Sequence, residues 1–221
     1  MPSEARAGKV EVPESGVSRA RAESERVSMS QRLWGIDWNG VLPWHFDDIR
    51  VEYARFVDVL PFMAELFPQT FNVGRQWFQE EMTEAKRRYG DEMDIFVFRD
   101  GDKIVGVITG NPSDWSTYYW RMVAILPEYR QRDLLRLFTE RCFAPFREAG
   151  VRRMEVDTSP ANRATVRHFS SQGFIVTSTL TSERWGLSLR FTKFLDEDAE
   201  RVYTTQFLDV PKIATKERSQ P

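Results

Sequence analysis

The chain has 221 residues, a hydrophobic fraction of 41%, a charged fraction of 29% and a formal net charge of −2 at pH 7. This size suffices for one large domain with a proper core, and the near-neutral charge gives no reason to expect a nucleic acid or an anionic membrane as partner. No apolar run approaches the ~20 residues of a spanning helix, and no signal peptide is apparent. The chain has one cysteine, Cys142, so no disulfide can form within it. We therefore expect a soluble cytoplasmic protein.

Residues 1–30 are rich in Ser, Ala, Glu and Arg and contain no aromatic residue. Such a segment cannot bury enough apolar surface to offset the entropy cost of ordering, so it is predicted to be disordered. Met29 is an alternative start to Met1. Both starts place the folded domain, predicted over residues 31–195, after this segment.

Trp34, Trp38 and Trp44 fall within eleven residues and are interleaved with glycine and proline. This pattern predicts an irregular, aromatic-rich N-terminal arm over residues 31–46. We expect the arm to cover part of the domain's own core, because large aromatic side chains usually pack. The alternatives are that the arm lines an acceptor pocket or the subunit contact of a homodimer, where aromatic residues are also favoured.

After the arm, apolar periodicity and turn residues predict alternating strands and helices. In chain order these are a strand at 49–54, helices near 54–67 and 74–89, a hairpin over 93–109, a strand at 118–126, a helix from the turn at 130–133 to Gly150, a strand at 151–157, a helix at 162–172, and strands at 174–180 and 185–194. The domain is predicted to end near Leu195. Residues 196–221 are predicted to form a solvated tail, with residues 202–210 as a candidate late edge strand.

The strand at 118–126 runs through a short polar turn directly into a helix. Pro127 cannot donate to a sheet ladder, so it marks the end of the strand. Arg130 to Asp133 then separate the strand from apolar residues at helical spacing. The start of a helix leaves unpaired N–H groups and the positive end of the helix dipole, so this turn can hold an anion such as a phosphate.

The segment V-x-I-L-P-E-Y-R-x-x-x-L-L resembles the acyl-CoA signature of the GNAT superfamily of N-acetyltransferases. In that family the turn reads Arg/Gln-x-x-Gly-x-Gly/Ala, and its backbone amides hold the pyrophosphate of coenzyme A. Arg130 matches the first position, whereas Asp133 and Leu135 stand where the two glycines should be. The resemblance implies these donor-binding residues: Ile125, Arg130, Gln131, Arg132, Asp133, Leu134, Leu135, Asn162 and Phe169.

A second segment, from Asn162 to Gly173-Phe174, is similar to the family's Asn-x-x-Ala-x-x-x-Tyr-x-x-x-Gly-Phe motif. Thr165 and Phe169 stand at the Ala and Tyr positions. The element order over about residues 47–195 is also that of the family. The resemblance implies an α+β fold, a mostly antiparallel central sheet with helices on both faces, and coenzyme A between the strands that end at Pro127 and Asp157.

Asp133 and Leu135 affect how the turn would bind the pyrophosphate of coenzyme A. If Asp133 faced the pyrophosphate, two unit charges about 5 Å apart at an effective dielectric of ~20 would repel by roughly 3 kcal/mol. We expect Asp133 to point to solvent instead and to cap its own helix. Leu135 replaces a glycine that would allow close approach of backbone and pyrophosphate.

In the family, the tyrosine of the second motif often protonates the departing thiolate, and Phe169 cannot do so. The candidate catalytic residues are Tyr119, Asn162 and His168, with Tyr118 as an alternative proton donor. Glu155 and Asp157 are alternative general bases. With only two histidines in the chain, no histidine-rich metal site is expected and no metal is required.

The resemblance implies an enzyme, an N-acyltransferase that moves an acyl group from acetyl-CoA or another acyl-CoA to an amine by direct attack. Acetyl is the acyl group that we expect. The acceptor would be a small molecule or a peptide amine. One alternative is an enzyme of the same fold that takes its acyl group from an acyl-carrier protein. Another is a non-catalytic binding or scaffold protein of this fold that has lost coenzyme A.

Overall fold

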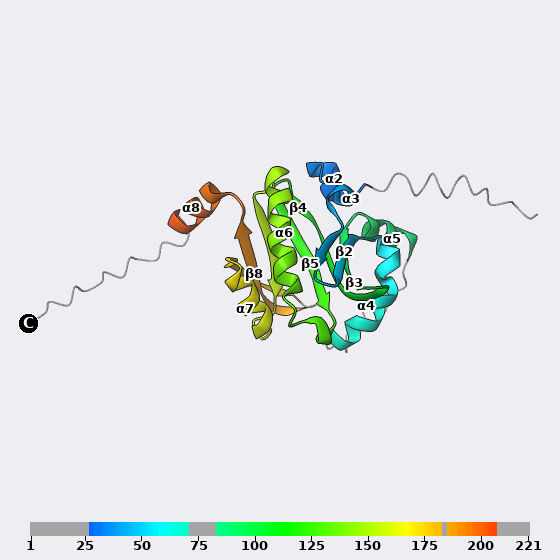
Figure 1. The fold of residues 1–221 in the computed structure, drawn as a ribbon. Helices are drawn as coiled ribbons and strands as arrows, with labels where there is room; N and C mark the ends of the chain where they lie inside the picture. Colours follow the sequence, from blue (N-terminus) through cyan, green and yellow to red (C-terminus); the bar gives the residue numbers. More distant parts are fainter. Residues whose placement is uncertain (1–26, 71–82, 183–184, 207–221) are drawn as a thin grey trace, which may run out of the picture.

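The computed structural model describes residues 27–70, 83–182 and 185–206, which form one eight-stranded sheet with helices on both faces (Figure 1). The strands are β1 (Trp44–Phe46), β2 (Ile49–Tyr53), β3 (Asp94–Asp100), β4 (Lys103–Asp114), β5 (Thr117–Ile125), β6 (Arg153–Thr158), β7 (Ile175–Ser182) and β8 (Gly186–Phe194). Their order is β1-β2-β3-β4-β5-β6-β8-β7, and only the β5–β6 pair is parallel. The expected mostly antiparallel α+β fold is confirmed.

The helices are α2 (Met29–Trp34), α3 (Trp38–Val41), α4 (Phe56–Thr70), α5 (Glu84–Asp91), α6 (Leu134–Glu148), α7 (Arg163–Ser171) and α8 (Glu197–Gln206), with a short 3-10 helix, η2 (Pro127–Tyr129), before α6. Helices α4 to α7 follow the expected order, whereas α2, α3 and α8 were not expected. None of the described helices is long and apolar enough to cross a membrane.

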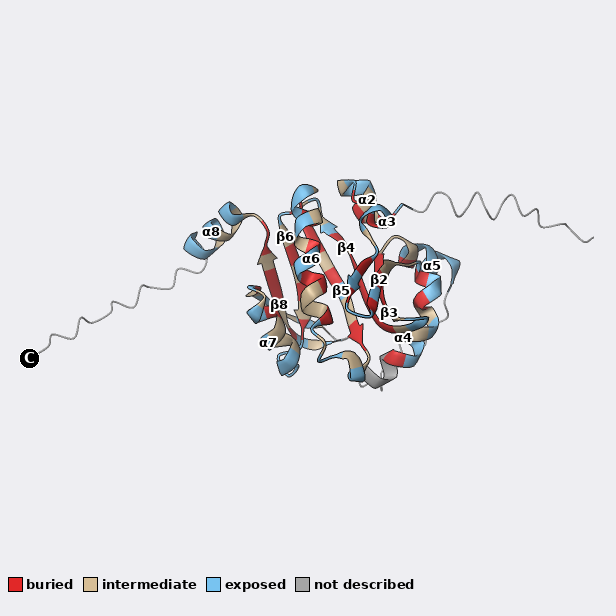
Figure 2. Cartoon of the chain, in the orientation of Figure 1, coloured by how far each residue is buried: buried red, intermediate tan, exposed pale blue. Residues whose placement is uncertain are grey.

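The centre of the sheet is buried on both faces (Figure 2). Successive side chains of a strand point to opposite faces. Thus Phe96 and Phe98 of β3 join the core beneath α6, whereas Ile95 and Val97 of the same strand join a second core beneath α4. Phe169 of α7 packs in the same core as α6. The sheet therefore has an α6–α7 face and an α4–α5 face.

The N-terminal arm packs on the α6–α7 face. Trp38 and Trp44 are only 2% and 6% exposed. The ring of Trp38 makes edge contacts with Phe96 and Phe146, with ring centres 4.9 and 5.4 Å apart. The arm therefore covers part of the core, and it is more regular than expected, because it forms α2, α3 and β1.

A buried carboxylate joins α2 to the sheet. Asp94 is fully buried and accepts hydrogen bonds from Ser30 Oγ at 2.8 Å, Tyr118 OH at 3.0 Å and Tyr53 OH at 3.1 Å. Burial raises the pKa of Asp94, and these hydrogen bonds oppose that rise. We call Ser30, Tyr53, Asp94 and Tyr118 the Asp94 cluster.

Several predicted boundaries shift. Ser28 and Ser30 are buried, so the folded part begins before Gln31, and residues 1–26 lie outside the described residues. Of the helix expected near 74–89, residues 74–82 also lie outside them, and the described part is α5. Residues 202–206 belong to helix α8, so the expected edge strand is wrong there, and residues 207–221 lie outside the described range.

Replacing Tyr118 with phenylalanine tests the Asp94 cluster. We expect Tyr118→Phe to lower the free energy of unfolding by about 1–3 kcal/mol, because a buried carboxylate loses a hydrogen-bond donor. Urea unfolding followed by tryptophan fluorescence measures the loss. Tyr129→Phe is the matched control, because Tyr129 OH donates to Asp100 at 2.8 Å in a more exposed place, where water can replace it. Equal losses in the two variants would contradict a special role for the buried cluster.

Candidate active site

The parallel strands β5 and β6 are paired over only four residues. Thr117–Trp120 pair with Arg153–Val156, although β5 continues to Ile125 and β6 to Thr158. Beyond Trp120 and Val156, no pairing between the two strands is recorded along their described length.

A β-bulge lies at the point where this pairing stops. On the other side of β5, Thr109 of β4 pairs with Met122, and Gly110 pairs with Trp120, so Arg121 has no partner in the ladder. An extra residue of this kind bends its strand and increases the local twist. The bulge at Arg121 therefore accounts for the end of the β5–β6 ladder at Trp120, after which the two strands diverge.

The turn before α6 lies at the end of the diverging β5. Asp133, the residue before α6, has φ 55° and ψ 13°, a left-handed conformation that favours glycine. The first backbone hydrogen bond of α6 runs from Leu137 N–H to Asp133 C=O at 3.0 Å. The N–H groups of residues 134–136 therefore have no acceptor within the helix. The turn keeps the backbone shape that glycine would give, and its amides can hold an oxyanion.

Most side chains of this turn are engaged within the protein. Arg130 Nε donates to Ile125 C=O at 2.9 Å, and Arg132 pairs with Asp48. Asp133 has a side chain that is 69% exposed, and its Oδ2 lies 3.2 Å from Arg136 Nη2. Gln131 is exposed, Leu134 is buried and Leu135 is half-buried against the core.

The expected cap at Asp133 is wrong. Its carboxylate does point to solvent, but it makes no hydrogen bond to the N–H groups of α6. The physical reason is the left-handed backbone, which differs from the extended backbone of a usual N-cap. The carboxylate pairs with Arg136, one turn into the helix.

The second motif lies on α7. Asn162 precedes the helix, and its Oδ1 accepts a hydrogen bond from Thr165 N–H at 3.3 Å, so its amide caps α7. Phe169 is only 1% exposed and packs against the rings of Trp120 and Phe174, at 6.3 and 5.1 Å between centres. In this structure Asn162 stabilises the helix start and Phe169 belongs to the core.

His168 lies beside Phe169, with their ring centres 5.1 Å apart. Burial lowers the pKa of the imidazole, and the charges of Asp133 and Arg136 act on it in opposite directions. His168 therefore lies within electrostatic range of the start of α6. Its Nε2 is buried and has no hydrogen-bond partner in the described part of the chain.

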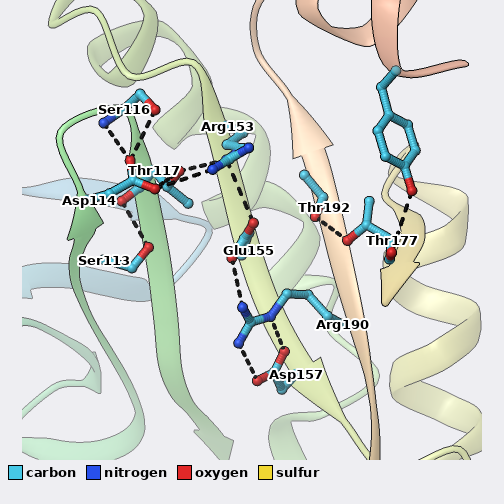
Figure 3. Close-up of polar contacts among 11 residues, drawn as sticks. Ser113, Asp114, Ser116, Thr117, Arg153, Glu155, Asp157, Thr177, Arg190 and Thr192 are labelled. Carbon is cyan, nitrogen blue, oxygen red and sulfur yellow. Dashed lines mark hydrogen bonds and ion pairs between the residues drawn. The ribbon is translucent and has the colours of Figure 1, made fainter. Parts of the chain in front are cut away.

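Polar side chains of β5, β6 and β8 form a row on the α4–α5 face, and Figure 3 draws three of them, Glu155, Asp157 and Arg190. Arg190 of β8 donates from Nε and Nη2 to the two carboxylate oxygens of Asp157, both at 2.9 Å. Its Nη1 lies 3.3 Å from Glu155 Oε2. Tyr119 OH donates to Asp157 Oδ2 at 3.1 Å. We call Tyr119, Glu155, Asp157 and Arg190 the polar row.

The charges of the polar row and of the adjoining Arg153 alternate and largely compensate one another. Glu155 has a side chain that is only 13% exposed, and Arg153 Nε lies 3.7 Å from its Oε1. Burial raises the pKa of Glu155, although Arg190 and Arg153 act to lower it. For Tyr119, burial and the Asp157 charge raise the pKa of the phenol. Glu155 is thus a largely buried carboxylate with a raised pKa.

The structure separates the predicted catalytic residues. Tyr119 lies on the α4–α5 face, whereas Asn162 and His168 lie on α7, across the sheet. Tyr118 is wrong as an alternative proton donor, because its hydroxyl is fully buried and donates to Asp94.

Arg190 is the member of the polar row that the sequence did not predict. A signal was present in V-R-R-M-E-V-D, where Arg153, Glu155 and Asp157 recur at period two along a central strand. Such a charged face requires partners on a neighbouring strand. Arg190, a single charge between Leu189 and Phe191, was the residue to consider.

A hollow of about 460 Å³ lies beside the polar row and beneath α8. It is lined by Arg152, Arg153, Glu155, Thr177, Thr192, Phe194, Asp196, Asp198, Ala199, Val202 and Tyr203. Its charged groups pair with one another or with neighbours, as Arg152 does with Asp196 at 3.9 Å and Arg153 with Asp114 at 3.2 Å. The hollow offers space beside Glu155 without a strong charge of either sign. Across the described ranges, no group of three or more His, Cys, Asp or Glu residues could hold a metal ion.

Comparisons with known proteins give a match to one family model. Residues 60–174 match the family model described as the acetyltransferase (GNAT) family. No curated protein sequence matches the chain.

Three solved structures show the same fold. A Salmonella typhimurium protein with its cofactor acetyl-CoA is 17% identical, with a TM-score of 0.53 over 68% of this chain and 96% of that one. A variant of spermidine N-acetyltransferase from Vibrio cholerae is 16% identical, with a TM-score of 0.53 over 70% and 98%. A GNAT family acetyltransferase from Elizabethkingia anophelis with acetyl-CoA bound is 10% identical, with a TM-score of 0.50 over 67% and 99%.

Removing the charge of Asp133 tests the turn as a pyrophosphate site. Asparagine is similar in size and tolerates the left-handed backbone. We expect Asp133→Asn to lower the Kd for coenzyme A about two- to fivefold at low salt, because an exposed charge contributes an interaction energy of this size. The effect should be smaller at high salt, because salt screens the charge. Titration calorimetry measures it, with Asp102→Asn in the β3–β4 turn as control. Unchanged or weaker binding in Asp133→Asn would contradict the assignment.

Proposed function

Because the chain belongs to the acetyltransferase (GNAT) family, we propose that it transfers an acetyl group from acetyl-CoA to the amine of a small-molecule or peptide acceptor. The observation that carries the proposal is the placement of the α6 turn and the polar row on either side of the divergence of β5 from β6. When bound, acetyl-CoA supplies a thioester carbonyl that an amine can attack directly. Positioning of the two reactants then supplies much of the rate enhancement.

Two buried polar atoms support a donor site between α6 and α7. Among the described residues, the buried side-chain N and O atoms that lack a hydrogen-bond partner are Trp120 Nε1 and His168 Nε2. Trp120 is the last residue of β5 paired with β6, and it packs between Phe138 of α6 and Phe169 of α7. An unsatisfied buried group costs about 1–3 kcal/mol. Two such groups beside the divergence fit a site whose polar ligand comes from outside the chain.

The residues that would hold the donor are those of the turn. The N–H groups of residues 134–136 would bind the pyrophosphate, and the Asp133–Arg136 ion pair reduces the repulsion from Asp133. Leu135 places a side chain where the family has a second glycine, so we expect weaker donor binding than in a turn with both glycines.

On the α4–α5 face, Glu155 is the residue we propose as general base. An amine reaches the enzyme largely as an ammonium ion and must lose a proton before it attacks. The raised pKa of Glu155 makes it a stronger base than an exposed glutamate. Arg190 holds Glu155 and Asp157 in place, and Tyr119 is held by Asp157.

Phe169 has no hydroxyl group, so it cannot donate a proton to the departing thiolate. A thiol has an ordinary pKa near ~8.5, so its thiolate leaves without protonation, at a cost of something like ~10²-fold in rate. His168 is the competing proton donor in this proposal, because its ring lies beside Phe169. We therefore expect a slow enzyme whose chemistry depends on positioning.

The direct test is release of free thiol from acetyl-CoA by the purified chain with a panel of amines. Acetylation of at least one amine supports the proposal. Thiol release with an acyl-carrier protein as donor, but not with acetyl-CoA, would favour the carrier-protein alternative. Neither release nor binding of coenzyme A would favour a binding or scaffold protein.

Glu155→Gln tests the proposed base. We expect kcat/KM to fall about 10²- to 10⁴-fold, because the amine loses the group that accepts its proton. In the parent enzyme, kcat/KM should rise with pH through the raised pKa of Glu155, since the carboxyl must be deprotonated to act as a base, and this rise should vanish in the variant. Glu148→Gln, at the exposed end of α6, is the control. Retention of the rise in Glu155→Gln would assign the base to another group.

A further inference from the structure

Arg121, the extra residue of the bulge, is exposed and held in place by neutral groups. Its Nη2 donates to Tyr89 OH at 2.7 Å, and its Nε donates to Asn111 Oδ1. The guanidinium carbon lies 5.5 Å from the centre of the Tyr89 ring. The amide of Asn111 is itself oriented, because its Nδ2 donates to Pro112 C=O at 2.6 Å. The guanidinium of Arg121 is therefore held in place by Tyr89 of α5 and Asn111 of β4.

Arg190 of the polar row and the adjoining Arg153 differ from Arg121 in their partners. Arg190 contacts the carboxylates of Glu155 and Asp157, and Arg153 contacts those of Asp114 and Glu155. For Arg121, no carboxylate partner is found in the described part of the chain. Of the three arginines, Arg121 is thus the one whose positive charge no described carboxylate contacts directly.

Arg121 lies on the same face as the proposed base. In the sheet register Asn111 is opposite Tyr119, and Tyr119 is opposite Glu155, so these side chains share one face. Neighbouring strands are about 4.8 Å apart, which puts Asn111 on the order of 10 Å from Glu155. The Arg121 guanidinium at Asn111 and the Glu155 carboxylate therefore lie on either side of Tyr119 on this face.

We propose that the acceptor carries an oxyanion, a carboxylate or a phosphate, which Arg121 binds while Glu155 receives the proton of its amine. This inference rests on the proposed function and names the substrate class of that site. The two recorded hydrogen bonds use two of the five N–H donors of the guanidinium, and the others remain for the ligand. The separation favours an acceptor with several carbon atoms between amine and oxyanion.

The experiment compares matched acceptors with acetyl-CoA as donor. δ-Aminovalerate carries a carboxylate, δ-aminovaleramide is its neutral counterpart, aminobutyl phosphate carries the alternative oxyanion, and glycine tests a short separation. For the parent enzyme, we expect kcat/KM to be roughly 10- to 100-fold higher for δ-aminovalerate than for its amide. This ratio corresponds to the free energy of a hydrogen bond to a charged group. A kcat/KM for aminobutyl phosphate that exceeds the value for δ-aminovalerate would support an acceptor with an oxyanion and identify that oxyanion as a phosphate.

Three variants identify the residue responsible. Arg121→Gln should remove most of the preference for carboxylate over amide, chiefly through KM, and Arg121→Lys should retain part of it, because lysine keeps the charge without the planar fork. Arg141→Gln is the control, because the guanidinium of Arg141 lies over the ring of Trp44 on the opposite face and should not affect the ratio. Thermal unfolding of each variant confirms that the fold is retained.

The outcomes separate this inference from the proposed function. Acetylation of neutral amines with no preference for an oxyanion, or an equal loss for both acceptors in Arg121→Gln and Arg121→Lys, would overturn the role of Arg121 and leave the transferase intact. A preference for glycine over δ-aminovalerate would overturn the assigned separation. Acetylation of no amine at all would remove the proposed function and this inference with it.

Discussion

The brief parallel pairing of β5 with β6 is the constraint on which the proposed site depends. Four residues pair on each strand, and the bulge at Arg121 then turns β5 away. Had the ladder continued to Ile125, the sheet would separate the amides of the α6 turn from the carboxylates of the polar row. Because the ladder stops at Trp120, no strand pairing joins β5 to β6 beyond that residue, and the bulge that follows it also places the guanidinium of Arg121.

The electrostatics of the two faces differ in kind. On the α6–α7 face, the turn offers backbone dipoles, and the nearby Asp133 and Arg136 charges compensate one another. On the α4–α5 face, Arg153 and the charged residues of the polar row are held 2.9 to 3.7 Å apart in alternating order. Partly buried charges remain ionised only when each has an opposite neighbour. The row is thus a rigid polar surface, which suits the orientation of a substrate better than the binding of a bare ion.

Much of the fold could be predicted from the sequence, because strands, helices and turns are determined by short-range patterns. The hairpin at Asp100-Gly101 and the strand–turn–helix through Asp133 are such cases. Features that depend on contacts between distant residues could not be predicted in this way. Arg190 pairs with Asp157 from 33 residues away, and Tyr118 and Tyr119 have opposite roles because a strand alternates its side chains between two faces. Helix α8 was missed because its apolar residues also suit a strand.

The Asp94 cluster also has a consequence for the order of folding. Ser30 and Asp94 are separated by 64 positions, and the nearby hydrogen bond from Trp34 Nε1 to Trp115 C=O spans 81. Closing loops of this length costs entropy before any contact compensates for it, and such contacts slow folding. Helix α2 has no complete docking site until β2, β3 and β5 have assembled, since each supplies one residue of the cluster. The first described helix of the chain is therefore expected to be among the last to reach its native place, and until then Asp94 remains hydrated at the open edge of the core.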